Sequence, residues 1–181
     1  MIFHDDLIKT ARIVGAGGVV ALPTEGIWGL SCQIGNFSAI RRLLDLKKRD
    51  REKGLITLVI DFAHLDPWFT CPVIELAQHE SGRPPTWIIP VNDDCPKLLT
   101  GGRNSMAARR VKMPYLLRLI RITGPLVSTS ANRSGRAACT NRWQVMNQLA
   151  GLVDHVAMGQ TQGYRKPSTI REMQTGTIIR D

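Results

Sequence analysis

The sequence of 181 residues lacks several features that identify secreted, membrane-bound or metal-bound proteins. Its four cysteines lie far apart and form no Cys-x-x-Cys pair, so we expect reduced, buried thiols rather than disulfides or a zinc site. No apolar run approaches the roughly 20 residues that cross a bilayer. The N-terminus has neither the charged nor the apolar region of a secretory signal. We therefore expect a cytoplasmic protein without a membrane span.

Both common phosphate-binding loops are also absent. The sequence contains no Gly-x-x-x-x-Gly-Lys-Ser/Thr motif and no Gly-x-Gly-x-x-Gly motif. The glycine-rich run at residues 15–18 precedes a predicted strand instead of joining a strand to a helix, which is the wrong context for a phosphate loop. A site for a phosphate-bearing ligand therefore has to be built from other groups.

A long stretch of the chain has no acidic residue at all. Between Asp94 and Asp154 there is no Asp or Glu, and the net charge of the whole chain is +9. The stretch holds ten cations: Lys97, Arg103, Arg109, Arg110, Lys112, Arg118, Arg121, Arg133, Arg136 and Arg142. A positive field of this kind attracts polyanions such as tRNA. The alternative is a solvated basic face that has no partner.

The apolar pattern predicts alternating strands and helices. A hydrophobic content of 43% allows one domain over residues 1–181 with a sizeable core. Strands are predicted at residues 18–23, 54–60, 86–91, 126–130, 152–157, 168–170 and 177–180. Helices are predicted at residues 38–48, 71–80, 114–122 and 144–150. This alternation indicates an α/β fold, and we expect Trp28, Trp68, Trp87 and Trp143 in its core.

Polar clusters follow or close three of the apolar stretches. They are residues 23–25, the cations Lys47, Arg49 and Lys53, and residues 128–132. Side chains at the ends of rigid elements are well placed to build a pocket. A cation at a helix C-terminus also favours the helix dipole without any ligand. Three cations within seven residues fit an oxyanion site better, so the pattern predicts a site for a phosphate-bearing ligand.

Four motifs in the same order and spacing resemble the YrdC family. They are Pro23-Thr24-Glu25-Gly26-Ile27-Trp28-Gly29-Leu30, Leu46-Lys47-Lys48-Arg49 with Lys53-Gly54, Ser128-Thr129-Ser130-Ala131-Asn132-Arg133-Ser134-Gly135, and Pro167-Ser168-Thr169-Ile170. The second and third include the family's Lys-x-Arg and Ser-x-Asn pairs. Each motif alone is weak, but the four together run through almost the whole chain. The sequence is most similar to the short, single-domain bacterial branch of the family.

The resemblance implies a fold and a reaction. The fold would be a single-domain, open, twisted mixed sheet with flanking helices and a concave positive face. The reaction would combine L-threonine, bicarbonate and ATP into threonylcarbamoyl-AMP and pyrophosphate, with Mg²⁺ carried on ATP and no protein-bound metal. Downstream threonylcarbamoyl-transfer proteins would then use the product to form threonylcarbamoyladenosine in tRNA.

The resemblance also assigns roles to residues of this chain. Lys47 and Arg49 would stabilise charge during catalysis and bind the nucleotide. The other nucleotide-binding residues would be Lys53, Ser130, Asn132 and Arg180. The threonine-binding residues would be Thr24, Arg109, Ser128 and Ser168.

Some positions depart from the family pattern or leave alternatives open. The family's Trp-Pro-Gly-Pro-x-Thr is altered over residues 80–86, where Thr86 is retained but the turn before it differs. Two adjacent arginines, Arg109 and Arg110, compete for the threonine carboxylate, and the offset from Ser105 favours Arg109. Glu25 is either a base or a structural carboxylate.

Two rival functions remain open at this stage. The main rival is an RNA-binding protein that has kept the YrdC-like fold without the synthase reaction. The other is a paralogue with a different carbamoyl chemistry. The intact Lys-x-Arg and Ser-x-Asn pairs favour the enzyme, because binding alone requires only surface charge.

Overall fold

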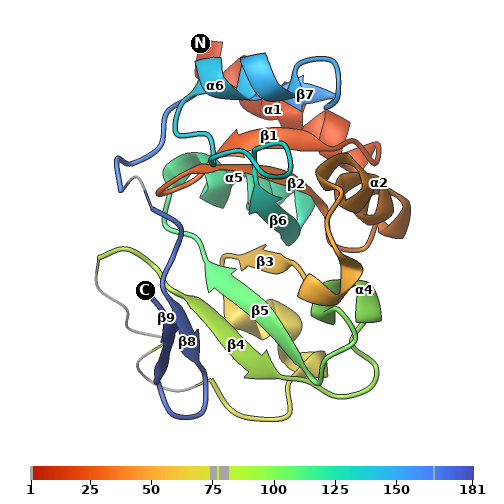
Figure 1. The fold of residues 1–181 in the computed structure, drawn as a ribbon, viewed down its shortest axis with the longest axis vertical. Coiled ribbons are helices and arrows are strands. Elements are labelled where there is room, and N and C mark those ends of the chain that lie inside the picture. The colour runs from red at the N-terminus through yellow and green to blue at the C-terminus, as the bar shows by residue number, and fades with distance from the viewer. Residues whose placement is uncertain (1, 74–76, 78–81, 165) are drawn as a thin grey trace.

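The computed structural model describes residues 2–73, 77, 82–164 and 166–181. Within these ranges a single sheet joins nine strands in the order β7-β1-β2-β6-β3-β5-β4-β8-β9 (Figure 1). The β1–β7, β3–β5 and β4–β8 pairs are parallel and the other neighbours are antiparallel. The fold is therefore an α/β structure with an open mixed sheet, as predicted.

The strands are β1 (Val20–Pro23), β2 (Trp28–Gln33), β3 (Ile56–Val59), β4 (Thr86–Pro90), β5 (Ser105–Arg110), β6 (Leu126–Ser130), β7 (His155–Val156), β8 (Ile170–Glu172) and β9 (Ile178–Arg180). The α-helices are α1 (Ile2–Gly15), α2 (Phe37–Lys47), α4 (Lys97–Thr100), α5 (Pro114–Thr123) and α6 (Arg142–Leu149). Two 3₁₀ helices are η1 (Arg51–Lys53) and η2 (Phe62–Trp68). None of the described helices combines the length and apolar character needed to cross a membrane.

Helices cover both faces of the sheet because the strand residues alternate between two cores. Along β1, Ala21 packs in the cluster that includes α2 and α6, whereas Val20 and Leu22 pack in the cluster that includes α1 and α5. Successive side chains of a strand point to opposite faces, so this run of buried residues requires cover on each side. A third cluster joins η2 to β4 and β5 in the lower part of the molecule (Figure 1).

The structure confirms most of the predicted elements, and within the described residues it adds six that the pattern missed. The predicted helix over residues 71–80 falls largely on positions outside the described residues. The missed elements are the helices α1 and α4, the strands β2 and β5, and the 3₁₀ helices η1 and η2. β2 alternates buried apolar residues with Gly29, Ser31 and Gln33, a period-two signal weakened by the glycine. β5 contains alanines and arginines that favour strands little by themselves, so its neighbours β3 and β4 decide its conformation.

The tryptophan prediction is right for Trp28 and Trp87, which are fully buried, and Trp68 packs partly buried against the core. It is wrong for Trp143, whose exposure is 72%. Trp143 lies in the first turn of α6, whose inner face is formed by Val145 and Leu149 instead. The four cysteines are free thiols in the part of the chain that the structure describes, and three of them are buried.

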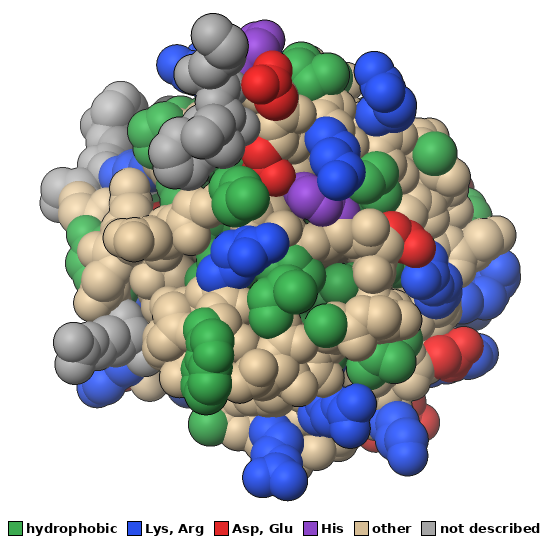
Figure 2. Space-filling model, turned by 90° about the horizontal axis from the view of Figure 1, so that it is seen from above, with side chains coloured by type: hydrophobic (Ala, Val, Ile, Leu, Met, Phe, Trp, Pro, Cys, Tyr) green, Lys and Arg blue, Asp and Glu red, His purple; other side chains and the backbone are tan. Residues whose placement is uncertain are grey.

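The cations of the acid-free stretch are spread over several elements. Arg118 and Arg121 are exposed on α5, whereas Arg133 and Arg136 are exposed in the loop after β6. On the face seen from above, Lys and Arg side chains are separated by hydrophobic, acidic and other side chains (Figure 2). This face is therefore a mixed surface rather than one continuous positive area.

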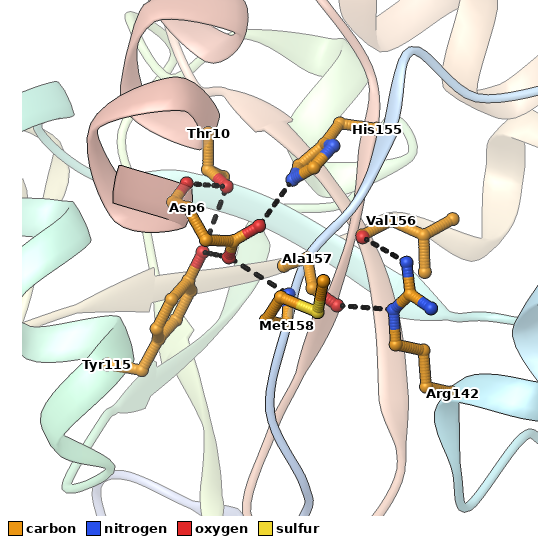
Figure 3. A network of polar contacts seen from close by, with 8 residues as sticks. All are labelled: Asp6, Thr10, Tyr115, Arg142, His155, Val156, Ala157 and Met158. Atoms are coloured by element: carbon orange, nitrogen blue, oxygen red, sulfur yellow. Dashed lines mark hydrogen bonds and ion pairs between the residues drawn. The ribbon is translucent and has the colours of Figure 1, made fainter. Parts of the chain in front are cut away.

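A buried carboxylate fastens α1 to the top of the sheet (Figure 3). Asp6 accepts hydrogen bonds from the Tyr115 hydroxyl at 3.0 Å and the Met158 backbone N–H at 2.9 Å, and its other oxygen lies 2.9 Å from His155 Nε2. Thr10 bonds to both Tyr115 and the Asp6 carbonyl. One side chain thus links α1, α5, β7 and the segment that leaves β7.

Replacing this carboxylate should destabilise the fold. We expect Asp6→Asn to lower the free energy of unfolding by about 2–3 kcal/mol, because it replaces a buried carboxylate that accepts hydrogen bonds from Tyr115 and Met158 and contacts His155. Urea denaturation measures the change. Asp5→Asn, one residue away and exposed, is the matched control and should stay within about 0.5 kcal/mol. Equal stability of the two variants would contradict this account of Asp6.

Candidate functional site

A small cavity lies where β1, β2, β3, β5 and β6 meet the segment before β8. Its walls include Gly26, Ile27, Trp28, Gly29, Ile56, Leu58, Thr129, Lys166 and Pro167. They also include six residues that the sequence predicted: Thr24, Arg109, Ser128, Ser130, Ser168 and Arg180. The structure therefore gathers all four predicted threonine-binding residues and two of the predicted nucleotide-binding residues around one space.

A glycine leaves space beside the Ser128 hydroxyl and the Thr24 side chain in the cavity wall. A Cβ atom on Gly29 would lie 2.6 Å from Ser128 Oγ and 3.5 Å from the Thr24 methyl group. Ser128 Oγ also accepts a hydrogen bond from Ser31 Oγ at 3.1 Å, and Thr24 Oγ1 donates to the Ile27 carbonyl at 2.7 Å. The two hydroxyls are thus held in orientation by these bonds, and Gly29 leaves the space beside Ser128 Oγ open.

Ser168 and Arg180 form another part of the cavity wall. Ser168 is buried, and its hydroxyl bonds to Thr86 Oγ1 at 2.6 Å. Arg180 Nη2 donates to the Ser168 carbonyl at 3.0 Å, so β9 holds this wall in place. Thr86 lies at the start of β4 and supports Ser168 from behind. Sequence reasoning found Thr86 as the retained residue of the altered segment but gave it no role.

The alternation of β5 separates the two adjacent arginines. Arg109 is buried and lines the cavity. Arg110 lines a different hollow, together with Asp61, Asp66 and other residues of the η2 region. Because neighbouring strand residues point to opposite faces, only one of the pair can reach the cavity. The geometry favours Arg109, in agreement with the offset from Ser105.

Arg109 forms a buried ion pair with Glu25. Arg109 Nη2 lies 3.3 Å from Glu25 Oε2, and the exposed fractions of the two side chains are 9% and 1%. Glu25 Oε1 accepts the Lys112 backbone N–H at 3.1 Å. Among the described residues, Arg109 Nε has no hydrogen-bond partner. Of the two roles considered for Glu25, this geometry supports the structural one.

A second polar cluster adjoins the cavity at the end of β6. Lys47 Nζ donates to the Asn132 carbonyl at 2.6 Å and to Asn132 Oδ1 at 2.7 Å. Ser130 Oγ donates to the same amide oxygen at 2.7 Å. Since Ser130 also lines the cavity, it joins the two parts of the site. The Lys-x-Arg and Ser-x-Asn motifs therefore meet in space although they lie far apart in the sequence.

The cations of this cluster are held in a partly desolvated position. Burial, and next the charge of Arg49, lower the pKa of Lys47 from 10.5 to about 8. Burial, and next the charge of Arg103, lower the pKa of Arg49. Sequence reasoning did not assign Arg103 to the site, and a motif search gives no signal for it. Cations that disfavour each other in this way indicate a site prepared for an anion.

The turn after α2 sets the direction of these cations. Lys48 adopts a left-handed conformation (φ 45°) and ends the helix with backbone bonds back to its last turn. This conformation is uncommon for a residue other than glycine. Arg49 then bonds through Nε to the Gly54 carbonyl at 3.1 Å. The Lys53 side chain is exposed. In the described contacts, Lys53 meets Arg49 through its backbone carbonyl and not through its side chain.

The altered segment contributes one further cation near the cavity. Arg83 Nη2 donates to the Lys166 carbonyl at 2.6 Å, and its guanidinium lies 5.6 Å from the centre of the Tyr164 ring. Residues 80 and 81 of this segment lie outside the described residues. Across the described ranges, no group of three or more His, Cys, Asp or Glu residues is placed to hold a metal ion.

Fold and site together define an α/β protein whose hydroxyl- and arginine-lined cavity adjoins a cationic cluster, an arrangement suited to small anionic ligands. The family model described as telomere recombination, Sua5/YciO/YrdC, matches residues 12–181. The chain belongs to the Sua5/YciO/YrdC family. A threonylcarbamoyl-AMP synthase of Stutzerimonas stutzeri is 39% identical over 175 residues, which cover 95% of each chain.

Solved structures agree with this assignment. Sua5 of P. abyssi complexed with L-threonine has a TM-score of 0.83 and 26% identity, covering 95% of this chain and 52% of the other. The chain thus spans about half the length of that protein. YciO of E. coli, at 20% identity, shares the fold with a TM-score of 0.79 over 97% of this chain and 88% of its own.

The depressed pKa of Lys47 predicts a stability change with a definite sign. At pH 7 the folded protein holds a charge that burial disfavours, so Lys47→Met should raise the free energy of unfolding by about 1 kcal/mol. Above about pH 8 folded Lys47 loses its proton while the unfolded chain keeps it until about 10.5. The free energy of unfolding of the wild type therefore rises between about pH 8 and 10.5, and the stability difference between Lys47→Met and the wild type becomes smaller.

Urea denaturation at pH 7 and pH 9.5 measures this effect. Lys48→Met, a change at the exposed neighbour, is the control and should shift stability by no more than about 0.5 kcal/mol at either pH. A Lys47→Met variant less stable than the wild type at pH 7 would show that the lysine is a structural hydrogen-bond donor.

Proposed function

We propose that this protein is a threonylcarbamoyl-AMP synthase. It forms threonylcarbamoyl-AMP and pyrophosphate from L-threonine, bicarbonate and ATP, and the product serves the threonylcarbamoyladenosine modification of tRNA. The observation that carries the proposal is the junction at Ser130, where a cavity suited to an amino acid adjoins a cluster suited to phosphate. The names of the relatives agree with it.

Threonine occupies the cavity in this proposal. Arg109 binds the carboxylate, since it lines the cavity and a guanidinium fork matches the two carboxylate oxygens. Thr24, Ser128 and Ser168 supply hydroxyl groups around the remainder of the amino acid. The apolar side chains of Ile56 and Leu58 form a surface that suits the threonine methyl group.

ATP lies against the second cluster in this proposal. Lys47 and Arg49 face its phosphates, and Ser130 and Asn132 hold phosphate or ribose oxygens by directional hydrogen bonds. Arg180 contributes from the cavity side, and Lys53 is exposed beside Arg49 and free to turn toward a phosphate chain. Mg²⁺ arrives on ATP, where it offsets phosphate charge.

The reaction brings two anions together, which explains the need for fixed cations. The threonine nitrogen bonds to the carbon of bicarbonate, and water is lost as a carbamate forms. A carbamate oxygen then attacks the α-phosphorus of ATP, the bond from that phosphorus to the β-phosphate oxygen breaks, and pyrophosphate leaves. Lys47 and Arg49 stabilise the negative charge that builds up, and a partly buried site strengthens this effect.

The proposal includes the wider setting of the reaction. Residues 1–181 act as a single domain in the cytoplasm and hand the product to threonylcarbamoyl-transfer proteins. The exposed arginines of α5 are available for tRNA. Because they lie away from the cavity residues, contact with tRNA and the synthase reaction can occur independently.

Pyrophosphate release from ATP tests the proposed function. We expect release only when L-threonine and bicarbonate are both present. L-Serine should be a poorer substrate, because the missing methyl group removes about 1 kcal/mol of binding in a fitted pocket. Release that is equal without any amino acid would contradict a synthase. Absence of release, together with salt-sensitive tRNA binding, would favour an RNA-binding protein of the same fold.

The two neighbouring arginines provide a matched pair of variants. Arg109→Lys should raise the KM for L-threonine by about tenfold or more and change the KM for ATP much less, because lysine keeps the charge but loses the planar fork. Arg110→Lys, on the opposite face of β5, should leave both constants near their wild-type values. The reverse result would move the carboxylate contact to Arg110.

A further inference from the structure

Glu25 is a buried carboxylate beside the cavity, but it is not one of the residues that line the cavity. It lies in the turn between β1 and β2, directly after Thr24, and its exposed fraction is 1%. Arg109 lines the cavity, whereas Glu25 stands behind it. A group in this position does not line the cavity, so it acts on a ligand through the residues that it holds.

Glu25 connects three separate segments that build the cavity. Its Oε1 accepts the Lys112 backbone N–H, which fixes the chain just after β5. Its Oε2 pairs with Arg109 Nη2. Its backbone carbonyl accepts the Gln162 N–H at 3.0 Å, so it also holds the segment that descends from β7 toward β8 (Figure 1). That segment carries Ser168 into the cavity wall.

The charge of Glu25 matters because two arginines meet at this point. The pKa of Arg83 is lowered by burial and next by the charge of Arg109, while the charge of Glu25 opposes that decrease. Without a carboxylate here, Arg83 and Arg109 would repel each other across a partly desolvated space. Arg109 would then turn away from the geometry that a bidentate contact requires.

The pairing also holds the Arg109 guanidinium at one end. Glu25 is near Nη2, and Nε is buried without a hydrogen-bond partner among the described residues. Because Arg109 lines the cavity, holding Nη2 fixes the orientation in which a carboxylate meets the guanidinium.

We propose that Glu25 is a positioning residue of the synthase: it sets the orientation of Arg109 and acts on L-threonine only through that arginine. This inference rests on the proposed function. It assigns Glu25 no proton transfer, because its oxygens face Lys112 and Arg109. It also makes the acidic residue after Thr24 a determinant of affinity for the amino acid rather than of the chemical step.

A double-mutant cycle between Glu25→Gln and Arg109→Lys tests the inference. The amide of Glu25→Gln retains an acceptor for Lys112 N–H and removes the charge. We expect the KM for L-threonine to rise about 10- to 100-fold, with a smaller change in kcat and none in the KM for ATP. In the Arg109→Lys background the same change should add less than about twofold, since the residue through which Glu25 acts is already lost.

Controls separate this result from a loss of folding and from failure of the proposed function. Asp154→Asn removes the carboxylate of the Arg42 ion pair, which lies outside the cavity, and should lower stability without a change in the KM for L-threonine. If Glu25→Gln does not fold, Glu25→Asp keeps the charge on a shorter side chain and should still raise that KM. Wild-type turnover without L-threonine would refute the synthase itself, before any variant is compared.

Three results would overturn the role of Glu25. One is a wild-type KM for L-threonine in Glu25→Gln, or in Glu25→Asp if that variant is the one that folds. Another is a fully additive double mutant, which would mean that Glu25 acts by a route other than Arg109. The third is a fall in kcat at unchanged KM, which would make Glu25 a participant in the chemical step. Calorimetric titration with L-threonine gives an affinity that is independent of turnover.

Discussion

Strand β6 pairs antiparallel with β2, and both parts of the site depend on that register. Gly29 is opposite Ser130 and Ser31 is opposite Ser128, although the latter two residues are 97 positions apart in the chain. The pairing places the open space of Gly29 against the Ser128 hydroxyl and brings the end of β6 to Lys47. A slip of one residue would turn these hydroxyls to the opposite face, and both the cavity and the cationic cluster would be lost.

The site keeps its cations under conditions that oppose them. Lys47 is buried beside Arg49, and Arg109 is buried near Arg83. Hydrogen bonds to Asn132 hold the lysine, and the Glu25 carboxylate holds Arg109. Folding alone gives no reason to gather like charges in this way. An anionic ligand relieves the repulsion, so the strain at this point of the fold is consistent with binding of carboxylate and phosphate.

Much of the fold could be predicted because the buried elements are strongly patterned. The spacing of apolar residues predicted the helix that ends at Lys47 and the strand that ends at Ser130, and the structure confirms both elements. β5 could not be predicted, since alanine and arginine acquire a strand conformation there only between β3 and β4. The sequence pattern also could not predict that Trp143 is exposed, because a tryptophan beside apolar residues looks like a core residue in the sequence.

The sequence by itself determined which chemical groups are available: the Lys-x-Arg and Ser-x-Asn pairs, the hydroxyls of Thr24 and Ser168, and two candidate arginines. The tertiary structure decided how they are used. It turned Arg109 into the cavity and Arg110 away from it, and it buried Glu25 against Arg109. The physical reason is that a motif specifies groups along the chain, whereas burial, charge pairing and the face of a strand depend on contacts between segments far apart in sequence.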